Sequence, residues 1–273
     1  MRPRFLLCGW LALILVYALA PRFCPAAEEP SLSRQQMEHF LLTAKVVKSK
    51  YASKGITNTW RLTLSDGTIT HDAHFQAVDE HRLGMKFSNG SSELLFVDSY
   101  KYNIAASRLA EMLGLEDMVP VYVERKWEAQ IGSLGWWLPV EMDEVERLRR
   151  KISPPDIDSW DRQMYKVRVL DELVYDTDAN LTNVLIGHDW RIYRIDFTRA
   201  FRLSKNLRSA ANLVRCDRGL LEKLKALNGE ELANRTKGYL NKEEVKAIMA
   251  RRDKIVAYFQ KLIADQGENA VLY

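Results

Sequence analysis

The segment from Leu173 to Arg202 constrains the fold of this chain more than any other, because it alternates short apolar runs with turn residues. Apolar runs stand at 184–186 and 191–195, and a Gly-His-Asp-Trp sequence at 187–190 joins them. Short apolar runs separated by a polar turn are typical of a β-hairpin. The sequence therefore predicts two antiparallel strands at this point.

Three polar residues flank the predicted hairpin. Asp178 and Asn183 precede its first strand, and Asp196 ends its second strand. Because the second strand returns along the first, Asp196 is expected to lie beside Asn183. Carboxylate and amide oxygens suit Mg²⁺, which is usually held by one or two carboxylates together with substrate phosphates. The alternative interpretation is a turn-rich hairpin whose Asp and Asn side chains only accept hydrogen bonds from nearby backbone groups.

The spacing D-x4-N followed by I-D-F resembles the catalytic loop and the metal-binding Asp of the protein-kinase-like superfamily. The resemblance is closest to its lipid-kinase (phosphatidylinositol 3- and 4-kinase) and HipA-like branch. It implies an α+β, bilobal kinase-like fold with a small β-rich N-lobe and a mostly helical C-lobe. It also implies roles for three residues: Asp178 as the base that orients the attacking hydroxyl, and Asn183 and Asp196 as ligands of Mg²⁺ on the phosphates of ATP.

The order of the predicted elements agrees with this resemblance. Residues 28–140 correspond to the N-lobe-like part and residues 141–273 to the C-lobe-like part, which contains the catalytic loop and the C-terminal helices. Helices are expected at 99–113, 158–174, 206–228, 230–235 and 241–264. Asp98 or Ser99 is expected to cap the first of these and Gly114 to end it, and Asp158 or Ser159 to cap the second.

The predicted nucleotide site lies in the N-lobe-like part. Strands expected at 56–66 and 68–79 resemble the pair that covers the nucleotide in a kinase. The turn before them contains Gly55, Thr57 and Asn58, whose backbone N–H groups are expected to face the phosphates. A further short strand is expected at 135–140. By the same resemblance, its end is the hinge, so that Leu138 would contact adenine.

Two replacements in this nucleotide site stand out. Gln76 occupies the position where the resemblance leads us to expect a phosphate-binding lysine, and Asn103 is the polar residue nearest to the expected glutamate. The loss of such a cation costs several kcal/mol of transition-state stabilisation, roughly as for other deleted active-site donors. Lys86 and Lys101 are candidates to supply the missing charge. The paired loss of lysine and glutamate favours a degenerate member of the superfamily.

Residues 1–27 have the pattern of a secretory signal peptide. Arg2 and Arg4 precede an apolar run from Phe5 to Ala20, and small residues follow. An uncleaved N-terminal membrane anchor is the alternative. The segment carries three of the 40 basic residues and none of the 36 acidic ones, so its removal lowers the formal net charge from +4 to +1. This balance gives no reason to expect a nucleic-acid partner.

Cysteine use is sparse outside this segment. Of the three cysteines, only Cys216 follows residue 27, so the processed chain is expected to have no internal disulfide. A single cysteine of this kind is expected to be a buried small apolar residue.

These observations support three functions. The first is an atypical, exported kinase-like phosphotransferase that uses ATP and Mg²⁺ on a protein, lipid or small-molecule acceptor. The second is a pseudokinase, in which the same fold binds nucleotide or protein. The third is a metal-dependent hydrolase built on the same carboxylates. Export here means a periplasmic, secreted or secretory-pathway location, and a membrane is a partner only if residues 1–27 remain attached.

Overall fold

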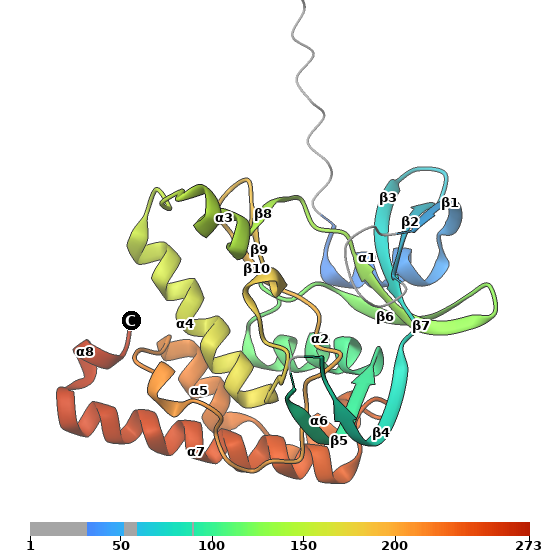
Figure 1. Cartoon of the computed structure of the whole chain (residues 1–273). Helices are drawn as coiled ribbons and strands as arrows, with labels where there is room; N and C mark the ends of the chain where they lie inside the picture. The colour runs from blue at the N-terminus through green and yellow to red at the C-terminus, as the bar shows by residue number, and fades with distance from the viewer. Residues whose placement is uncertain (1–31, 52–58, 89) are drawn as a thin grey trace, which may run out of the picture. The chain divides into compact units, whose positions relative to one another are not determined.

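The computed structural model describes residues 32–51, 59–88 and 90–273 (Figure 1). Within it, Ser33–Tyr273 forms one unit, β-rich in its first half and mainly helical in its second. The strands are β1 (Lys45–Tyr51), β2 (Thr59–Ser65), β3 (Thr70–Gln76), β4 (Asp79–Lys86), β5 (Ser92–Ser99), β6 (Tyr122–Trp127), β7 (Gln130–Trp136), β8 (Val140–Asp143), β9 (Val184–Gly187) and β10 (Ile192–Arg194). The helices are α1 (Arg34–Thr43), α2 (Lys101–Leu113), α3 (Glu144–Arg150), α4 (Ile157–Val174), α5 (Arg218–Ala226), α6 (Gly229–Arg235), α7 (Lys242–Gln266) and α8 (Glu268–Val271), with 3-10 turns η1 (Leu181–Asn183) and η2 (Ala210–Asn212). The predicted α+β class is confirmed.

The first half is built on a five-stranded antiparallel sheet of order β1-β2-β3-β7-β6. Its strands alternate apolar and polar residues, so that Leu62, Leu64 and Phe75 point to one face and are buried there. Helix α1 covers this face with Phe40 and Leu41, which belong to the same hydrophobic cluster. The predicted lobe boundary at residue 140 falls where β7 leads into β8.

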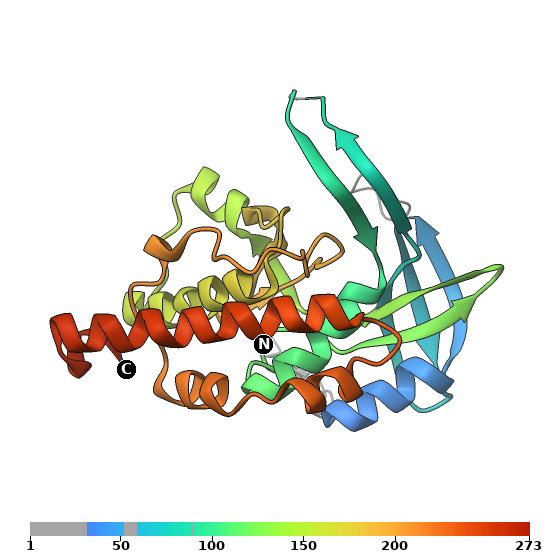
Figure 2. The same ribbon diagram turned by 90° about the horizontal axis from the view of Figure 1, so that it is seen from below.

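Between β3 and α2 the chain forms a separate two-stranded hairpin, β4–β5. Figure 2 shows it extending away from the five-stranded sheet. Most of its side chains are exposed, including Leu83 at 87% and Leu94 at 83%. An isolated two-stranded hairpin is only marginally stable in water. Its contacts with the rest of the unit are therefore essential to its position.

Helix α2 follows the hairpin and is buried on most sides. It ends at Gly114, as predicted, and the φ of +69° at this residue is one that glycine adopts without steric cost. The predicted cap at Asp98 or Ser99 is wrong, because the helix begins at Lys101 with Tyr100 at the N-cap and no side-chain cap. Strand β5 continues to Ser99 and takes both residues into the ladder.

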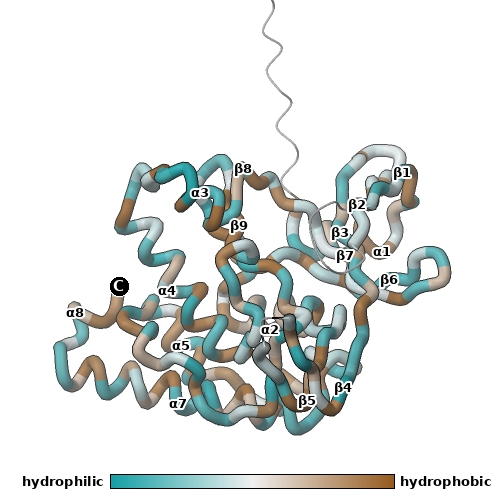
Figure 3. The backbone as a smooth tube through the Cα atoms, in the orientation of Figure 1, coloured by the Kyte–Doolittle hydropathy of each residue, from teal (hydrophilic) through white to brown (hydrophobic). Residues whose placement is uncertain are grey.

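The second half packs around one large hydrophobic cluster to which α2, α4, α5 and α7 contribute. Helix α7 begins with a capping box at Asn241 and buries one face, so that hydrophobic and hydrophilic residues mix along it (Figure 3). Helix α4 is capped by Asp156, whose carboxylate accepts the N–H of Ser159. The predicted cap at Asp158 or Ser159 is therefore wrong by two or three residues. Cys216 is free and buried.

The helix predicted at 206–228 is wrong in its first half. Only α5, from Arg218 to Ala226, and the short turn η2 are helical there. The two carboxylate oxygens of Glu172, on α4, accept the backbone N–H groups of Arg208 and Ser209 at 2.7 and 2.8 Å. These bonds satisfy the backbone in an irregular conformation and hold the segment against α4.

The hairpin predicted at 184–195 is present. Strand β10 pairs antiparallel with β9, with Ile192 opposite Ile186 and Arg194 opposite Val184. Strand β8 pairs on the other side of β9 and completes a three-stranded sheet. Both Ile186 and Ile192 are fully buried, which explains why this short hairpin has a fixed register.

Candidate active site

The C-terminal end of α4 leads into the loop that carries Asp178. The chain turns at Tyr175, which has a φ of +49°. Buried Asp176 then accepts the backbone N–H of Asp178 at 2.9 Å, and the N–H of Thr177 donates to the carbonyl of Arg199 at 3.2 Å. These bonds fix the loop while the side chain of Asp178 remains 50% exposed. A carboxylate held in this way can take a proton from a substrate hydroxyl.

Asn183 lies at the end of turn η1 and is buried. Its Nδ2 donates to the carbonyl of Asp178 at 3.2 Å, and its own carbonyl accepts the N–H of Ile195 at 3.0 Å. The amide nitrogen is therefore committed to the loop, which leaves Oδ1 as the atom suited to a cation. The backbone hydrogen bond from Ile195 places Asp196, which follows Ile195, beside this turn.

Asp196 has a left-handed backbone conformation, with a φ of +58°. Such a conformation costs a residue other than glycine about 1–3 kcal/mol and needs support from its surroundings. Here the N–H of buried Phe197 donates to Asn103 Oδ1 at 2.8 Å, and the Thr198 hydroxyl donates to the Asp196 carboxylate at 3.1 Å. Burial raises the pKa of Asp196, and the nearby charge of Asp178 raises it further. The structure thus brings the three predicted residues into one neighbourhood.

Asp98 is a further carboxylate near Asp196. The sequence pattern marks it only as a candidate helix cap. The N–H of Ser99 donates to the carbonyl of Thr198 at 2.9 Å. Burial raises the pKa of Asp98, and the charge of Asp196 also raises it. Among the described residues, Asp98 Oδ1 is buried without a hydrogen-bond partner. A carboxylate oxygen without a hydrogen-bond partner is suited to act as a ligand of a hard divalent cation, which prefers oxygen ligands.

The described part of the chain has no group of three or more His, Cys, Asp or Glu side chains arranged to hold a metal ion. A cation at Asp196 would therefore also depend on Asn183 and on phosphate oxygens. This is the usual situation for Mg²⁺, which is bound by one or two carboxylates plus substrate phosphates rather than by a full protein cage.

Beneath the loop lies a buried ion network centred on Arg194. Its Nε donates to Asp171 at 2.9 Å and its Nη2 to Asp176, and its side chain is 1% exposed. Its guanidinium also lies 4.8 Å from the ring centre of Phe197. Burial lowers the pKa of Arg194, but the charges of the two carboxylates outweigh this effect and raise it. The network ties α4, the Asp178 loop and the strand before Asp196 together.

Gln76, which stands where the resemblance leads us to expect a lysine, belongs to a chain of hydrogen bonds between uncharged groups. Gln76 is buried at the end of β3, and its Oε1 accepts Asn103 Nδ2 at 3.1 Å. The same nitrogen lies 3.3 Å from Ser133 Oγ, and Asn103 Oδ1 accepts the N–H of Phe197. The chain connects β3, α2 and the segment after Asp196 through amide groups alone. The resemblance predicted both Gln76 and Asn103 to be replacements, and in the structure their side chains contact each other.

Restoring the lysine alone should destabilise the protein. Gln76→Lys places an ammonium in a buried site beside the neutral side chains of Asn103 and Ser133. We expect a loss of about 3 kcal/mol in the free energy of unfolding, as for other uncompensated buried charges. Gln76→Lys with Asn103→Glu supplies the opposite charge and should recover more than half of the loss. Urea unfolding measures both.

The control for this pair is Gln130→Lys, an exposed position on β7 of the same sheet. It should change the free energy of unfolding by less than about 0.5 kcal/mol. A Gln76→Lys variant as stable as the unsubstituted protein would mean that the site already compensates a cation.

The other residues predicted for the nucleotide site lie in different places. Gly55, Thr57 and Asn58 lie outside the described residues. Leu138 lies in the connection between β7 and β8, because β7 ends at Trp136 and the strand predicted at 135–140 is not continuous. This connection joins the two larger sheets, as a hinge would.

The two lysines considered as substitutes are the last residue of β4 and the first residue of α2. Lys86 is exposed at the far end of β4, roughly 20 Å along the strand from Asp79 at its base. Lys101 Nζ donates to Asp79 at 2.8 Å. Lys86 pairs with Ser92 on β5, the residue before Glu93.

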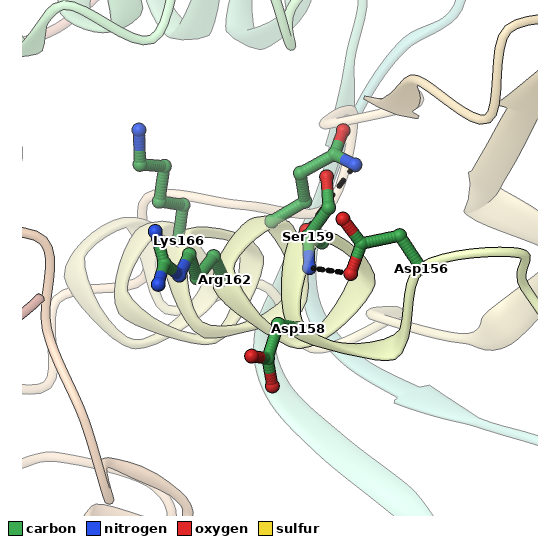
Figure 4. A pocket seen from close by; sticks show the side chains of 6 residues that line it. Asp156, Asp158, Ser159, Arg162 and Lys166 are labelled. Atoms are coloured by element: carbon green, nitrogen blue, oxygen red, sulfur yellow. Dashed lines mark hydrogen bonds between the residues drawn. The ribbon is translucent and has the colours of Figure 1, made fainter.

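A shallow surface hollow lies at the start of α4, away from this site. It is lined by Asp156, Asp158, Ser159, Arg162, Gln163 and Lys166 (Figure 4). Helix α4 has 18 residues, so its two ends are about 27 Å apart. Because the Asp178 loop follows the other end, the hollow contains none of the predicted site residues.

Neither a protein-family model nor a curated protein sequence matches this chain. Solved structures do match it. A hydra Fam20 structure with sugar has a TM-score of 0.62 at 13% identity, covering 88% of this chain and 91% of that one. The Golgi casein kinase with Mn and ADP bound has a TM-score of 0.60 at 12% identity, covering 88% and 78%.

A third similar structure is the proinflammatory kinase CtkA of Helicobacter pylori. Its TM-score is 0.50 at 8% identity, with 83% of this chain and 98% of that chain covered. At such low identities the likeness concerns the fold, and it extends over most of the chain. It does not distinguish the lipid-kinase and HipA-like branch from other branches. The chain has a protein-kinase-like fold.

Proposed function

We propose that this protein is a kinase-like phosphotransferase that uses ATP and a divalent cation, Mg²⁺ in the cell. One observation supports this most directly. In a kinase-like fold, a single loop and hairpin bring Asp178, Asn183 and Asp196 together through hydrogen bonds of the backbone and of the Asn183 amide. The presence of Mn and ADP in the Golgi casein kinase structure is consistent with a nucleotide and a divalent cation here.

The proposed roles follow from the surroundings of each residue. Asp178, half-exposed on a fixed loop, accepts the proton of the acceptor hydroxyl and orients it. Asn183 Oδ1 and the Asp196 carboxylate would hold the cation, and Asp98, whose Oδ1 is buried without a hydrogen-bond partner among the described residues, is a further candidate ligand. The cation neutralises charge on the phosphates when it is bound. Leu138, in the connection between the two larger sheets, is the proposed contact for adenine.

A second function has its own support. In the Gln76–Asn103 contact, two neutral amides replace the cation that phosphate transfer commonly uses. This favours a pseudokinase that binds nucleotide without transferring phosphate. The two functions share the binding site and differ in turnover, so that one experiment can separate them.

The test of nucleotide binding is a thermal-shift experiment with ATP and Mg²⁺, ATP alone and Mg²⁺ alone. A hundredfold excess over Kd stabilises the folded protein by about 2.7 kcal/mol, which corresponds to roughly 5–10 °C for a chain of this size. Asp196→Asn should abolish the Mg²⁺-dependent part of the shift. Asp253→Asn, an exposed carboxylate on α7, is the matched control and should keep it.

The outcomes have distinct meanings. A shift that needs both ATP and Mg²⁺, together with formation of ADP, supports the phosphotransferase. The same shift without ADP formation supports the pseudokinase. No shift at millimolar ATP, or a full shift in Asp196→Asn, contradicts the proposed site.

For location, we propose export directed by residues 1–27, with retention as a membrane anchor as the alternative. This segment lies outside the described residues. Within the described ranges, no helix is both long and apolar enough to cross a membrane. One of the similar structures is named as a Golgi kinase, which is consistent with this proposal. The acceptor we propose is a protein, a lipid or a small molecule.

A further inference from the structure

The β4–β5 hairpin contacts the loop of Asp178 through the partly buried side chain of Glu93. One carboxylate oxygen of Glu93 lies 2.6 Å from Arg199 Nη2, and the other lies 2.7 Å from Arg202 Nε. The side chains of the three residues are only 10–16% exposed. The hydroxyl of Thr177 lies within 3.4 Å of the same carboxylate. The contact with Arg199 is a charge-assisted hydrogen bond in a partly buried position, and such bonds are stronger than an ordinary surface ion pair.

Arg199 lies between this hairpin and the proposed base. Its guanidinium is 4.8 Å from the ring centre of Phe87 and 5.2 Å from that of Phe96, both from the hairpin region. On its other side, Nη1 is 3.8 Å from Asp178 Oδ1. This distance is too long for a hydrogen bond but short enough for electrostatic attraction. The guanidinium of Arg199 therefore lies between the two carboxylates, bonded to Glu93 and attracted to Asp178.

We propose that Glu93 is a positioning residue that holds Arg199 away from Asp178 and so keeps the carboxylate of Asp178 available to the acceptor hydroxyl. This inference rests on the proposed function, in which Asp178 is the base. Without Glu93, Arg199 would be free to form a direct, two-pronged ion pair with Asp178. That pair would occupy the oxygens that must accept the proton. The hairpin, although mostly exposed, would thus be part of the machinery for phosphate transfer.

The test measures ADP formation from ATP and Mg²⁺ by the purified protein, with water as acceptor, and MgATP binding by thermal shift. Glu93→Gln should lower kcat roughly 10-fold or more, since small displacements at a reacting centre have effects of this order. The KM for ATP should change less than about twofold, because Glu93 lies beside the base and not beside the metal ligands. Glu222→Gln, at an exposed carboxylate on α5 that pairs with Lys225, is the control and should leave kcat unchanged.

The decisive variant is the double substitution Glu93→Gln with Arg199→Gln. If Arg199 blocks Asp178 in Glu93→Gln, removing its charge should recover at least half of the lost kcat on a logarithmic scale. If Glu93 only stabilises the hairpin, the double variant should be as slow as Glu93→Gln or slower, and the inference is overturned. A normal kcat in Glu93→Gln also overturns it and leaves the proposed function intact. MgATP binding without ADP formation in the unsubstituted protein overturns both the role of Glu93 and the proposed phosphotransferase activity.

Discussion

Arg194→Met should lower the free energy of unfolding by about 3–5 kcal/mol, which is the usual cost of removing one partner from a buried ion pair. The methionine fills similar space but leaves Asp171 and Asp176 without a cation. Asp176 also accepts the N–H of Asp178, so we expect the loop of the proposed base to lose its fixed conformation as well. Urea unfolding followed by circular dichroism measures the stability.

Arg191→Met is the matched control on the same hairpin. Arg191 is 51% exposed, and its Nε lies 3.7 Å from Asp189. Loss of such a surface pair should cost no more than about 1 kcal/mol. If Arg194→Met were equally mild, the network around Arg194 would not be what connects α4 to the strand before Asp196.

Asp178→Asn should lower the rate of phosphate transfer by about 10²–10⁴-fold, the range expected for loss of a general base. The substitution preserves size and leaves the N–H of residue 178 bonded to Asp176. We therefore expect the thermal shift with MgATP to remain, because Asn183 and Asp196 are unchanged. The comparison separates chemistry from nucleotide binding.

Asp189→Asn serves as the control for this experiment. Asp189 is an exposed carboxylate in the turn between β9 and β10, and its substitution should leave the rate unchanged. A rate for Asp178→Asn within tenfold of the unsubstituted protein would show that another group accepts the proton.

The sequence predicted best where local pattern and final packing agree. The hairpin of β9 and β10 was predictable because its apolar runs and polar turn are sufficient to define two strands. The proximity of Asn183 and Asp196 then followed from the return of the second strand. Gln76 and Asn103 could likewise be paired as replacements, since the resemblance marked both positions.

Features that depend on distant partners were not predictable. Arg194 lies within an apolar strand, and its burial depends on Asp171 and Asp176, which come from another element. The first half of the helix expected at 206–228 does not form, because Glu172, more than 30 residues earlier, accepts the backbone N–H groups of Arg208 and Ser209. Local propensity contains no information about either contact.

The role of Glu93 belongs to the same class. Nothing near it in the sequence marks it as different from Glu80 on the other strand of the hairpin. Only the fold brings Arg199 and Arg202, more than 100 residues later, to its carboxylate. That Gly55, Thr57 and Asn58 face the phosphates of the nucleotide stays a prediction.

The neutral chain from Gln76 through Asn103 to Phe197 has a consequence for how this protein responds to its surroundings. An ion pair at this place would hold only while both of its partners kept their charges. Amide groups do not titrate. We therefore expect the contact of Gln76 with Asn103, which joins β3 to α2, to keep its strength when the pH changes. A movement of helix α2 or of strand β3 would break it.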